Sequence, residues 1–142
     1  MEKVVERFKI AEKSLNALKE AIDIYDSSTD ERYIKHLRNS KIQSFEFSID
    51  TLWKFLKIYF QRVFGADIKA SPKAIFRYCL QFGFTNEDET KKLLEMVDDR
   101  NISSHTYHEG LAEQLNKRIE EHYRLMKKIL DSADKESSLR KF

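Results

Sequence analysis

Apolar side chains recur every three or four positions near the start of the chain. This spacing returns to the same face of an α-helix, because a helix completes one turn in about 3.6 residues. The stripe consists of Val4, Phe8, Ala11, Leu15, Leu18, Ile22 and Tyr25. Residues 26–30 then bring two serines and a threonine between two aspartates, and such side chains compete for backbone hydrogen bonds. The pattern predicts one long helix followed by a turn.

A second and longer helical pattern covers residues 31–64. One stripe has the same spacing and consists of Phe45, Ile49, Leu52, Leu56, Tyr59 and Val63. A neighbouring stripe consists of Phe47, Trp53, Phe60 and Phe64. More of the circumference is therefore apolar than one bundle core uses. Two interpretations fit equally well: the surplus face contacts another protein, or the helix lies deeper in its own bundle.

Residue types that start and end helices divide the middle of the chain. Ser71 followed by Pro72 is typical of a helix start, and Gly83 is typical of a helix end. Thr85 or Asn86 begins the next helix, because the acidic residues that follow favour the positive end of the helix dipole. The sequence therefore predicts a short helix and then a longer one.

The last amphipathic segment spans residues 109–130, and the chain after it is polar. Glycine and proline, which interrupt helices, number only three and one in 142 residues. The patterns together predict an all-α protein of four main helices and one short extra helix. We expect a single domain over residues 1–132. A flexible C-terminal tail is expected over residues 133–142, because few apolar side chains are present to hold it.

The composition excludes several classes of protein. Lys and Arg number 26 against 24 Asp and Glu, and a net charge of +2 is too small to indicate nucleic-acid binding over the whole surface. No stretch has the ~20 consecutive apolar residues that a membrane span needs, and the charged first residues differ from a signal peptide. We therefore expect a cytoplasmic protein without membrane contact.

The sequence provides no set of residues for a metal or a cofactor, and we expect neither. Cys79 is the only cysteine, and no two histidines have the spacing of a zinc-binding helix. A glycine-rich phosphate loop is missing, as are the carboxylates that follow a strand and a Gly-Ser turn in a nucleotidyltransferase. We interpret Cys79 as a buried apolar residue, and His36 and His122 as structural.

Polar chemistry is concentrated at residues 98–108, where ten of eleven residues carry a polar group. A helix built only for packing would have an apolar residue every three or four positions. Asn101 and His105 lie one helical turn apart, so that the amide can orient the imidazole. We expect the helix to end near His105 and to leave Arg100, His105 and Tyr107 around one cleft.

This group of residues suits phosphoryl chemistry without a metal. A histidine can take a proton from a ribose 2′-hydroxyl or give one to a leaving 5′-oxygen, and a guanidinium can stabilise added negative charge on the phosphorus. Arg100 and His105 are therefore candidate catalytic residues. An alternative that fits the spacing equally well is that Arg100 pairs with Asp98 or Asp99 and that His105 caps the C-terminal end of the helix.

Two neighbours of this group are candidate accessory or RNA-binding residues. Ser104 precedes His105, and His108 follows Tyr107 in the chain. His108 is suited to carry an additional proton. We favour the alternative, a solvated histidine in a loop, because no partner residue has the required spacing.

The spacing of Arg100, His105 and Tyr107 resembles the R-x-x-x-x-H-x-Y signature of HEPN proteins (higher eukaryotes and prokaryotes nucleotide-binding), and Asn101 has the polar character typical of its position. Over about residues 5–130, the chain is similar to the HEPN subfamily of nucleotidyltransferase substrate-binding proteins. The residues that carry this similarity are Phe45-Glu46-Phe47, Leu52-Trp53-Lys54, Ser71-Pro72, Leu94-Glu95-Met96, Asp99-Arg100-Asn101 and Ser104-His105-Thr106-Tyr107.

The resemblance implies an antiparallel up-down four-helix bundle that forms a homodimer, with two copies of the motif facing one cleft. It also implies a partner, a minimal nucleotidyltransferase, in a toxin-antitoxin pair. The HEPN subunit would be a metal-independent ribonuclease acting on RNA, with Arg100 and His105 catalytic and Asn101 supporting their geometry. The partner would transfer AMP from ATP to Tyr107, and the added bulk and negative charge would repel an RNA phosphate.

Two other functions stay open at this point. A non-catalytic substrate-binding subunit of a nucleotidyltransferase complex fits the surplus apolar stripe and the low net charge. A bundle without any catalytic or nucleotide role is also consistent, if the motif is only an ion-paired helix end. Toxicity of the chain expressed alone, and relief of that toxicity by Arg100→Ala, would separate a ribonuclease from a non-catalytic subunit.

Overall fold

The computed structural model describes residues 1–105 and 107–142. Its α-helices are α1 (Glu2–Ser27), α2 (Ile34–Val63), α3 (Pro72–Gln81), α4 (Glu87–Ile102) and α5 (Glu109–Ser137). Two short 3₁₀ turns, Ser103–His105 and Leu139–Lys141, follow α4 and α5. The all-α class with four main helices and one short helix is therefore confirmed. Among the described helices, none is long and apolar enough to cross a membrane.

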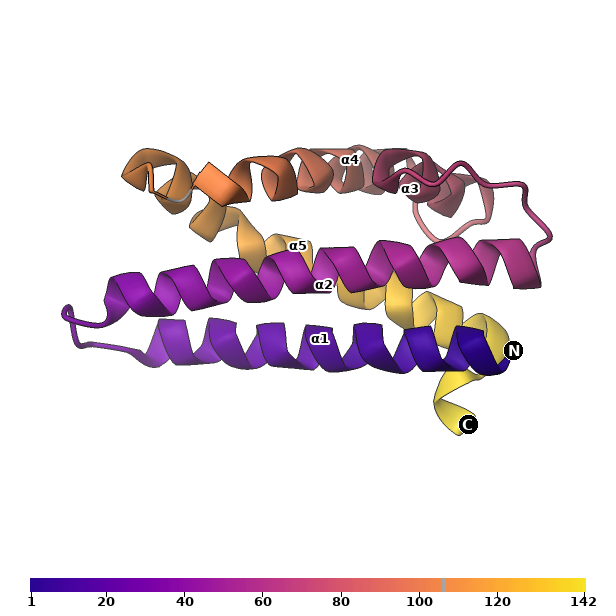
Figure 1. The fold of residues 1–142 in the computed structure, drawn as a ribbon, viewed down its shortest axis with the longest axis horizontal. Helices are drawn as coiled ribbons and strands as arrows, with labels where there is room; N and C mark the ends of the chain where they lie inside the picture. Colours follow the sequence, from indigo (N-terminus) through magenta and orange to yellow (C-terminus); the bar gives the residue numbers. More distant parts are fainter. Residues whose placement is uncertain (106) are drawn as a thin grey trace.

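The four long helices alternate in direction and form an up-down bundle (Figure 1). α1 and α2 lie side by side and are joined by a short loop at one end of the molecule. α4 runs back along α2 on the side away from α1, with the short α3 packed beside it. α5 then returns across α2 and α1, so that both chain termini lie at the same end.

The core consists of the apolar stripes that the spacing predicts. The buried positions of the first two stripes are Val4, Phe8, Ala11, Leu15, Leu18, Ile22, Phe45, Ile49, Leu52, Leu56 and Tyr59. Phe8 of α1 and Phe55 of α2 meet edge to face, with ring centroids 5.5 Å apart. Because burial of one large apolar side chain contributes about 2 kcal/mol, these stripes are a substantial part of what stabilises the bundle.

The second apolar stripe of α2 divides between two environments. Phe60 is fully buried, whereas Trp53 and Phe64 are half-buried. Phe64 stacks on Phe82 at the end of α3, with ring centroids 4.4 Å apart. Deeper burial in the bundle therefore accounts for the C-terminal half of α2. Phe47 is different, because 65% of its surface is exposed.

The helix ends use the residues that the sequence suggests. The Ser71 side chain accepts a hydrogen bond from the backbone N–H of Ala74 at 3.3 Å, ahead of α3. Asn86 and Glu89 cap α4 reciprocally, since each side chain accepts from the other residue's backbone N–H, at 2.8 and 3.0 Å. Gly83 has φ +78°, a left-handed conformation that glycine adopts without strain. These ends fix where α4 begins, and with it the faces on which its polar residues lie.

The C-terminal residues differ from the flexible tail that the polar sequence led us to expect. α5 continues to Ser137, and Ser138 turns the chain in a left-handed conformation with φ 52°. Leu139 is then fully buried in the core. Arg140 pairs with three carboxylates of α1 and α5. Leu139 and Arg140 thus hold this segment against the bundle, although its polar composition predicted that it would be free.

Candidate functional site

The polar segment lies where α4 ends and α5 begins. α4 stops at Ile102, and a 3₁₀ turn over Ser103–His105 follows, so the helix ends near His105 as predicted. The hydroxyl of Ser103 donates a hydrogen bond to the backbone carbonyl of Arg100 at 2.6 Å. Serine side chains that bond to the backbone in this way compete with the regular helix, which explains the stop.

Arg100 reaches from α4 to two carboxylates of α2. Its Nε and Nη2 donate to Asp50 at 3.2 and 3.0 Å, and its Nη1 donates to Glu46 at 2.7 Å. These side chains are about one-third exposed or less. The hydrogen bonds that Arg100 donates to Asp50 raise the pKa of its guanidinium, against a smaller opposing effect of burial. Arg100 is thus a fixed cation, and one of its faces is occupied by two anions.

The two aspartates before Arg100 have partners other than this arginine, so the alternative in which Arg100 pairs with Asp98 or Asp99 is wrong. Asp98 pairs with Lys73 of α3 at 2.7 Å. Successive residues on a helix point about 100° apart, so neighbours in sequence face different helices. The partners of Arg100 lie on α2, about 50 residues earlier in the chain. Spacing within the segment around Arg100 cannot reveal a contact over that separation.

Asp99 is buried and lies at the centre of a network between α4 and α5. Arg118 donates to it through Nε and Nη2, at 2.9 and 2.7 Å, and His122 Nε2 lies 2.6 Å from its Oδ2. Burial raises the pKa of the Asp99 carboxyl, but the hydrogen bonds from His122 and Arg118 outweigh burial and lower it to about 2. Asp99 therefore stays ionised at any physiological pH.

His105 and Tyr107 form a second small unit on the surface. His105 Nδ1 lies 3.2 Å from the Tyr107 hydroxyl, a hydrogen-bonding distance, and the rings are edge to face. Tyr107 is 82% exposed, and His105 is exposed as well. An exposed tyrosine hydroxyl beside an imidazole is a nucleophile with a proton acceptor at hand, provided that Nδ1 is the unprotonated nitrogen.

The remaining candidates have separate places in the structure. Asn101 and Ser104 are exposed. His108 is the N-cap of α5, because its Nδ1 accepts a hydrogen bond from the backbone N–H of Leu111 at 3.3 Å. The sequence suggested a cap by His105 at the C-terminal end of its helix; the histidine that caps a helix through a hydrogen bond is His108, at the start of α5. The interpretation of His108 as a loop histidine without a partner is therefore wrong, because its ring bonds to the backbone of Leu111.

The expected cleft around Arg100, His105 and Tyr107 divides into two parts within one chain. Arg100 turns towards α2, while His105 turns towards Tyr107. The hydrogen bonds of the described residues do not join the two groups. Sequence reasoning missed Glu46 and Asp50 as neighbours of Arg100. The available signal was an acidic pair four residues apart on a helix with two apolar stripes, since such a pair lies on one face.

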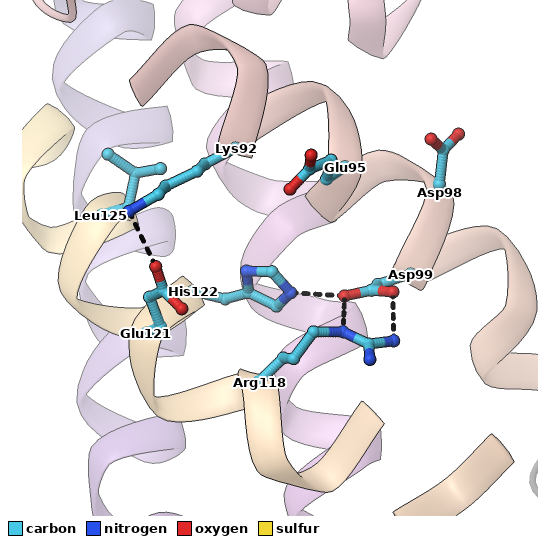
Figure 2. Close-up of a pocket in the computed structure, with 8 residues that line it drawn as sticks. All are labelled: Lys92, Glu95, Asp98, Asp99, Arg118, Glu121, His122 and Leu125. Carbon is cyan, nitrogen blue, oxygen red and sulfur yellow. Dashed lines mark hydrogen bonds and ion pairs between the residues drawn. The ribbon is translucent and has the colours of Figure 1, made fainter. Parts of the chain in front are cut away.

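A pocket of about 490 Å³ lies between α4 and α5, next to the Asp99 network (Figure 2). Its lining residues are Lys92, Glu95, Asp98 and Asp99 of α4, and Arg118, Glu121, His122 and Leu125 of α5. His122, which the sequence suggested as structural, is buried and stacks on Phe45 with ring centroids 5.3 Å apart. Arg100, His105 and Tyr107 do not line this pocket.

The residues that the structure describes include no group of three or more His, Cys, Asp or Glu side chains placed to hold a metal ion. Cys79 is fully buried, and burial raises the pKa of its thiol far above the usual value. A thiol in such surroundings packs as a small apolar group, in agreement with the interpretation from sequence.

Comparison with known families adds a match over nearly the whole bundle. The family described as "Nucleotidyltransferase substrate binding protein like" matches residues 6–135. A comparison with curated proteins gave no match. The matched range includes all of the residues of α2, α3 and α4 discussed above.

Solved structures have the same fold. A protein from Thermus thermophilus is 34% identical, with a TM-score of 0.76 over 87% of this chain and 98% of that one. A Haemophilus influenzae protein, described as having the fold of a substrate-binding domain of a nucleotidyltransferase, is 24% identical, with a TM-score of 0.75 over 89% and 98%. A toxin-antitoxin structure with AMP-PNP is 15% identical, with a TM-score of 0.68 over 92% and 96%.

Proposed function

This chain belongs to the family of nucleotidyltransferase substrate-binding proteins, and we propose that it is the subunit on which a partner nucleotidyltransferase acts, with the Tyr107 hydroxyl as the acceptor of an adenylyl group from ATP. A partner-associated role agrees with the family and with the shared fold of the toxin-antitoxin structure. The partner would be a minimal nucleotidyltransferase, which would bind the ATP.

One observation carries the proposal: the exposed Tyr107 hydroxyl lies 3.2 Å from His105 Nδ1. In the transfer, the Tyr107 oxygen attacks the α-phosphorus of ATP, and the bond from that phosphorus to the oxygen bridging to the β-phosphate breaks. Pyrophosphate leaves with the electrons of that bond. His105 Nδ1 accepts the phenolic proton, which makes the oxygen a stronger nucleophile as the new bond forms.

The surroundings of Tyr107 are suited to this reaction. The side chain is 82% exposed, so a second protein can reach its hydroxyl without unfolding the bundle. The residue follows the 3₁₀ turn of Ser103–His105 and precedes α5, outside the helices that hold the core. Transfer of an adenylyl group there adds negative charge to a surface that also carries His105.

Coexpression with a minimal nucleotidyltransferase from the same genome tests the proposal. We expect the two proteins to purify together, and the intact mass of this chain to increase by one adenylyl group located on the peptide containing Tyr107. An unmodified chain in a stable complex would contradict the acceptor role. It would instead support a subunit that presents another substrate to the partner.

The second candidate function is a metal-independent ribonuclease, favoured by the exposure of His105 next to an arginine-bearing helix end. In a homodimer, His105 of one copy would transfer protons and Arg100 would bind the RNA phosphate. The ion pairs of Arg100 with Asp50 and Glu46 oppose phosphate binding, so the guanidinium would first have to be released. Tyr107 with AMP attached would then switch this activity off by charge repulsion.

RNA decay in the presence of EDTA tests the second candidate. The wild-type chain should leave 2′,3′-cyclic phosphate ends, and His105→Ala should abolish cleavage. If RNA decays at the same rate with the wild type and with His105→Ala, the chain has no ribonuclease site at His105. Adenylyl transfer to Tyr107 is independent of this outcome, because it requires only the hydroxyl and its neighbour.

A further inference from the structure

Arg38 of α2 holds the first residue of α5. Its Nη1 and Nη2 donate to the two carboxylate oxygens of Glu109, at 2.8 and 3.2 Å, and its Nη1 also donates to Glu113, one turn further along α5, at 2.9 Å. The Arg38 side chain is only 4% exposed. The starts of α2 and α5 lie at the same end of the bundle (Figure 1). One buried cation therefore fixes both the place and the rotation of the first turn of α5.

Stability alone does not explain an arginine at this position. The Nε of Arg38 is buried and has no hydrogen-bond partner in the part of the chain that the structure describes. A buried donor without a partner costs free energy, and a well-packed apolar side chain often stabilises a protein as much as a buried ion pair does. A guanidinium paired with a carboxylate, in contrast, fixes a direction as well as a contact. The contact is therefore suited to set the geometry of the start of α5.

The start of α5 is continuous with the acceptor site. Glu109 lies two residues after Tyr107 in the chain. The backbone N–H of His108 donates to the carbonyl of His105 at 3.0 Å, and the His108 side chain caps α5. A series of contacts thus runs from Arg38 through the first turn of α5 to the backbone of His105.

The ring of Tyr107 has little packing to hold it in place. The side chain is 82% exposed and meets the His105 ring edge to face. The distance of 3.2 Å between its hydroxyl and His105 Nδ1 therefore depends on the backbone on both sides. On the α4 side, the buried Ser103 is hydrogen-bonded to the last turn of that helix. On the α5 side, the anchor is Glu109, held by Arg38.

We propose that Arg38, acting through Glu109, positions the Tyr107 hydroxyl against His105 for adenylyl transfer, which rests on the function proposed above. The hydrogen bonds of the described residues do not join Arg38 to Tyr107 or to His105, so Arg38 is a positioning residue. An imidazole accepts the proton of a hydroxyl efficiently only within hydrogen-bonding reach, and a small displacement caused by a distant change lowers the rate. Loss of the Glu109 contact therefore slows transfer while the bundle stays folded.

The free chain tests this geometry without a partner protein. Glu109→Gln removes the charge and keeps the size of the side chain. Glu121→Gln is the matched control, because both glutamates lie on α5, are 56% exposed and pair with a cation of another helix. The ring nitrogen signals of His105, read by ¹⁵N NMR, report its contact with the tyrosine hydroxyl, and Tyr107→Phe gives the signals without that contact. We expect Glu109→Gln to move the signals towards those of Tyr107→Phe, and Glu121→Gln to leave them unchanged.

Single-turnover adenylyl transfer, with the partner nucleotidyltransferase and ATP both saturating, tests the consequence for the reaction. We expect Glu109→Gln to be about tenfold slower than the wild type, and Glu121→Gln to react at the rate of the wild type. In a His105→Ala background, Glu109→Gln should cause no further loss, because the imidazole that it helps to align is gone. The same tenfold loss in that background would show that Glu109 acts on the fold or on docking, and would overturn the proposal.

A second variant tests the arginine itself. Arg38→Lys keeps the cation but cannot bind both oxygens of Glu109, so it should change the His105 signals and the transfer rate as Glu109→Gln does. Unchanged signals or an unchanged rate in Glu109→Gln would overturn the positioning role, while transfer to Tyr107 in the wild type would leave the proposed function standing. No transfer to the wild type would refute the proposed function and, with it, any role of Arg38 in the reaction, even if the signals of His105 move as expected.

Discussion

The Asp50 carboxylate of α2 holds the Arg100 guanidinium of α4 through two hydrogen bonds, at 3.2 and 3.0 Å. Paired bonds of this kind fix the plane of the guanidinium as well as its position. Together with Glu46, Asp50 ties the end of α4 to the middle of α2. The arginine of the polar segment is therefore a structural cation in the single chain, and any phosphate would have to compete with two carboxylates.

Asp50→Asn is expected to lower the free energy of unfolding by about 1 kcal/mol, because it weakens a paired, half-buried contact. Urea unfolding monitored by circular dichroism measures this change. Asp23→Asn is the matched control, since Asp23 pairs with Lys19 in an exposed contact within α1. The control should cost clearly less, because this pair is exposed to solvent. Equal losses in the two variants would show that the Arg100 contact has no particular strength.

Asp99 makes the stability of the chain depend on pH in the acid range. Its pKa is about 2 in the fold and 3.8 ordinarily, so the folded state prefers the ionised form. This contribution is fully present above about pH 4 and is lost as the pH falls through about 2; it amounts to about 2 kcal/mol.

The comparison of wild type with Asp99→Asn isolates that contribution from those of other carboxyl groups. Denaturant unfolding at pH 6 should show the variant less stable by about 3 kcal/mol, because Arg118 and His122 lose their shared partner. The difference should shrink as the pH is lowered from 4 to 2. A difference that stays constant over this interval would mean that Asp99 is not the titrating group.

His105→Ala should slow adenylyl transfer to Tyr107 by about a hundredfold or more, because the proton acceptor of the hydroxyl is lost. His108→Asn is the control. His108 caps α5, and asparagine is among the best capping residues, so this variant keeps the cap and its transfer rate. Initial rates with the partner nucleotidyltransferase and ATP measure both. Unchanged transfer in His105→Ala would remove the proposed role of the imidazole.

Leu139→Ala tests the attachment of the C-terminal segment. Leu139 is fully buried, and shortening a buried leucine to alanine costs about 3 kcal/mol. Leu80→Ala serves for comparison, since Leu80 on α3 is partly exposed and its truncation should change stability by about 0.5 kcal/mol. Thermal unfolding separates the two expectations. A Leu139 variant as stable as the Leu80 variant would mean that the segment does not contribute to the core.

The sequence was sufficient where structure depends on local pattern. The stripe from Val4 to Ile22 is buried because helical spacing brings those side chains to one face, and Asn86 caps α4 through residues three positions away. Pairs between helices, such as Arg100 and Asp50, could not be predicted. Nothing in the spacing of α4 reveals which side chains of α2 face it.

The prediction of a flexible C-terminal tail failed for a second reason: the average polarity of a segment conceals the burial of single residues. The last ten residues are polar on average, yet Ala133 and Leu139 are fully buried in the core. His122 lies on the apolar face of α5 and was correctly expected to be structural, but its bond to Asp99 depends on a helix packed against that face. The pocket beside it follows from the same packing and left no signature in either helix taken alone.

The most direct test of the account is the labelling of this chain by its nucleotidyltransferase partner with ATP radiolabelled at the α-phosphate. Tyr107→Phe removes only the acceptor hydroxyl at a highly exposed position, and Tyr33→Phe removes one from another exposed tyrosine. We predict label in the wild type and in Tyr33→Phe, and none in Tyr107→Phe. Equal labelling of Tyr107→Phe and the wild type would contradict the assignment of Tyr107 as the acceptor.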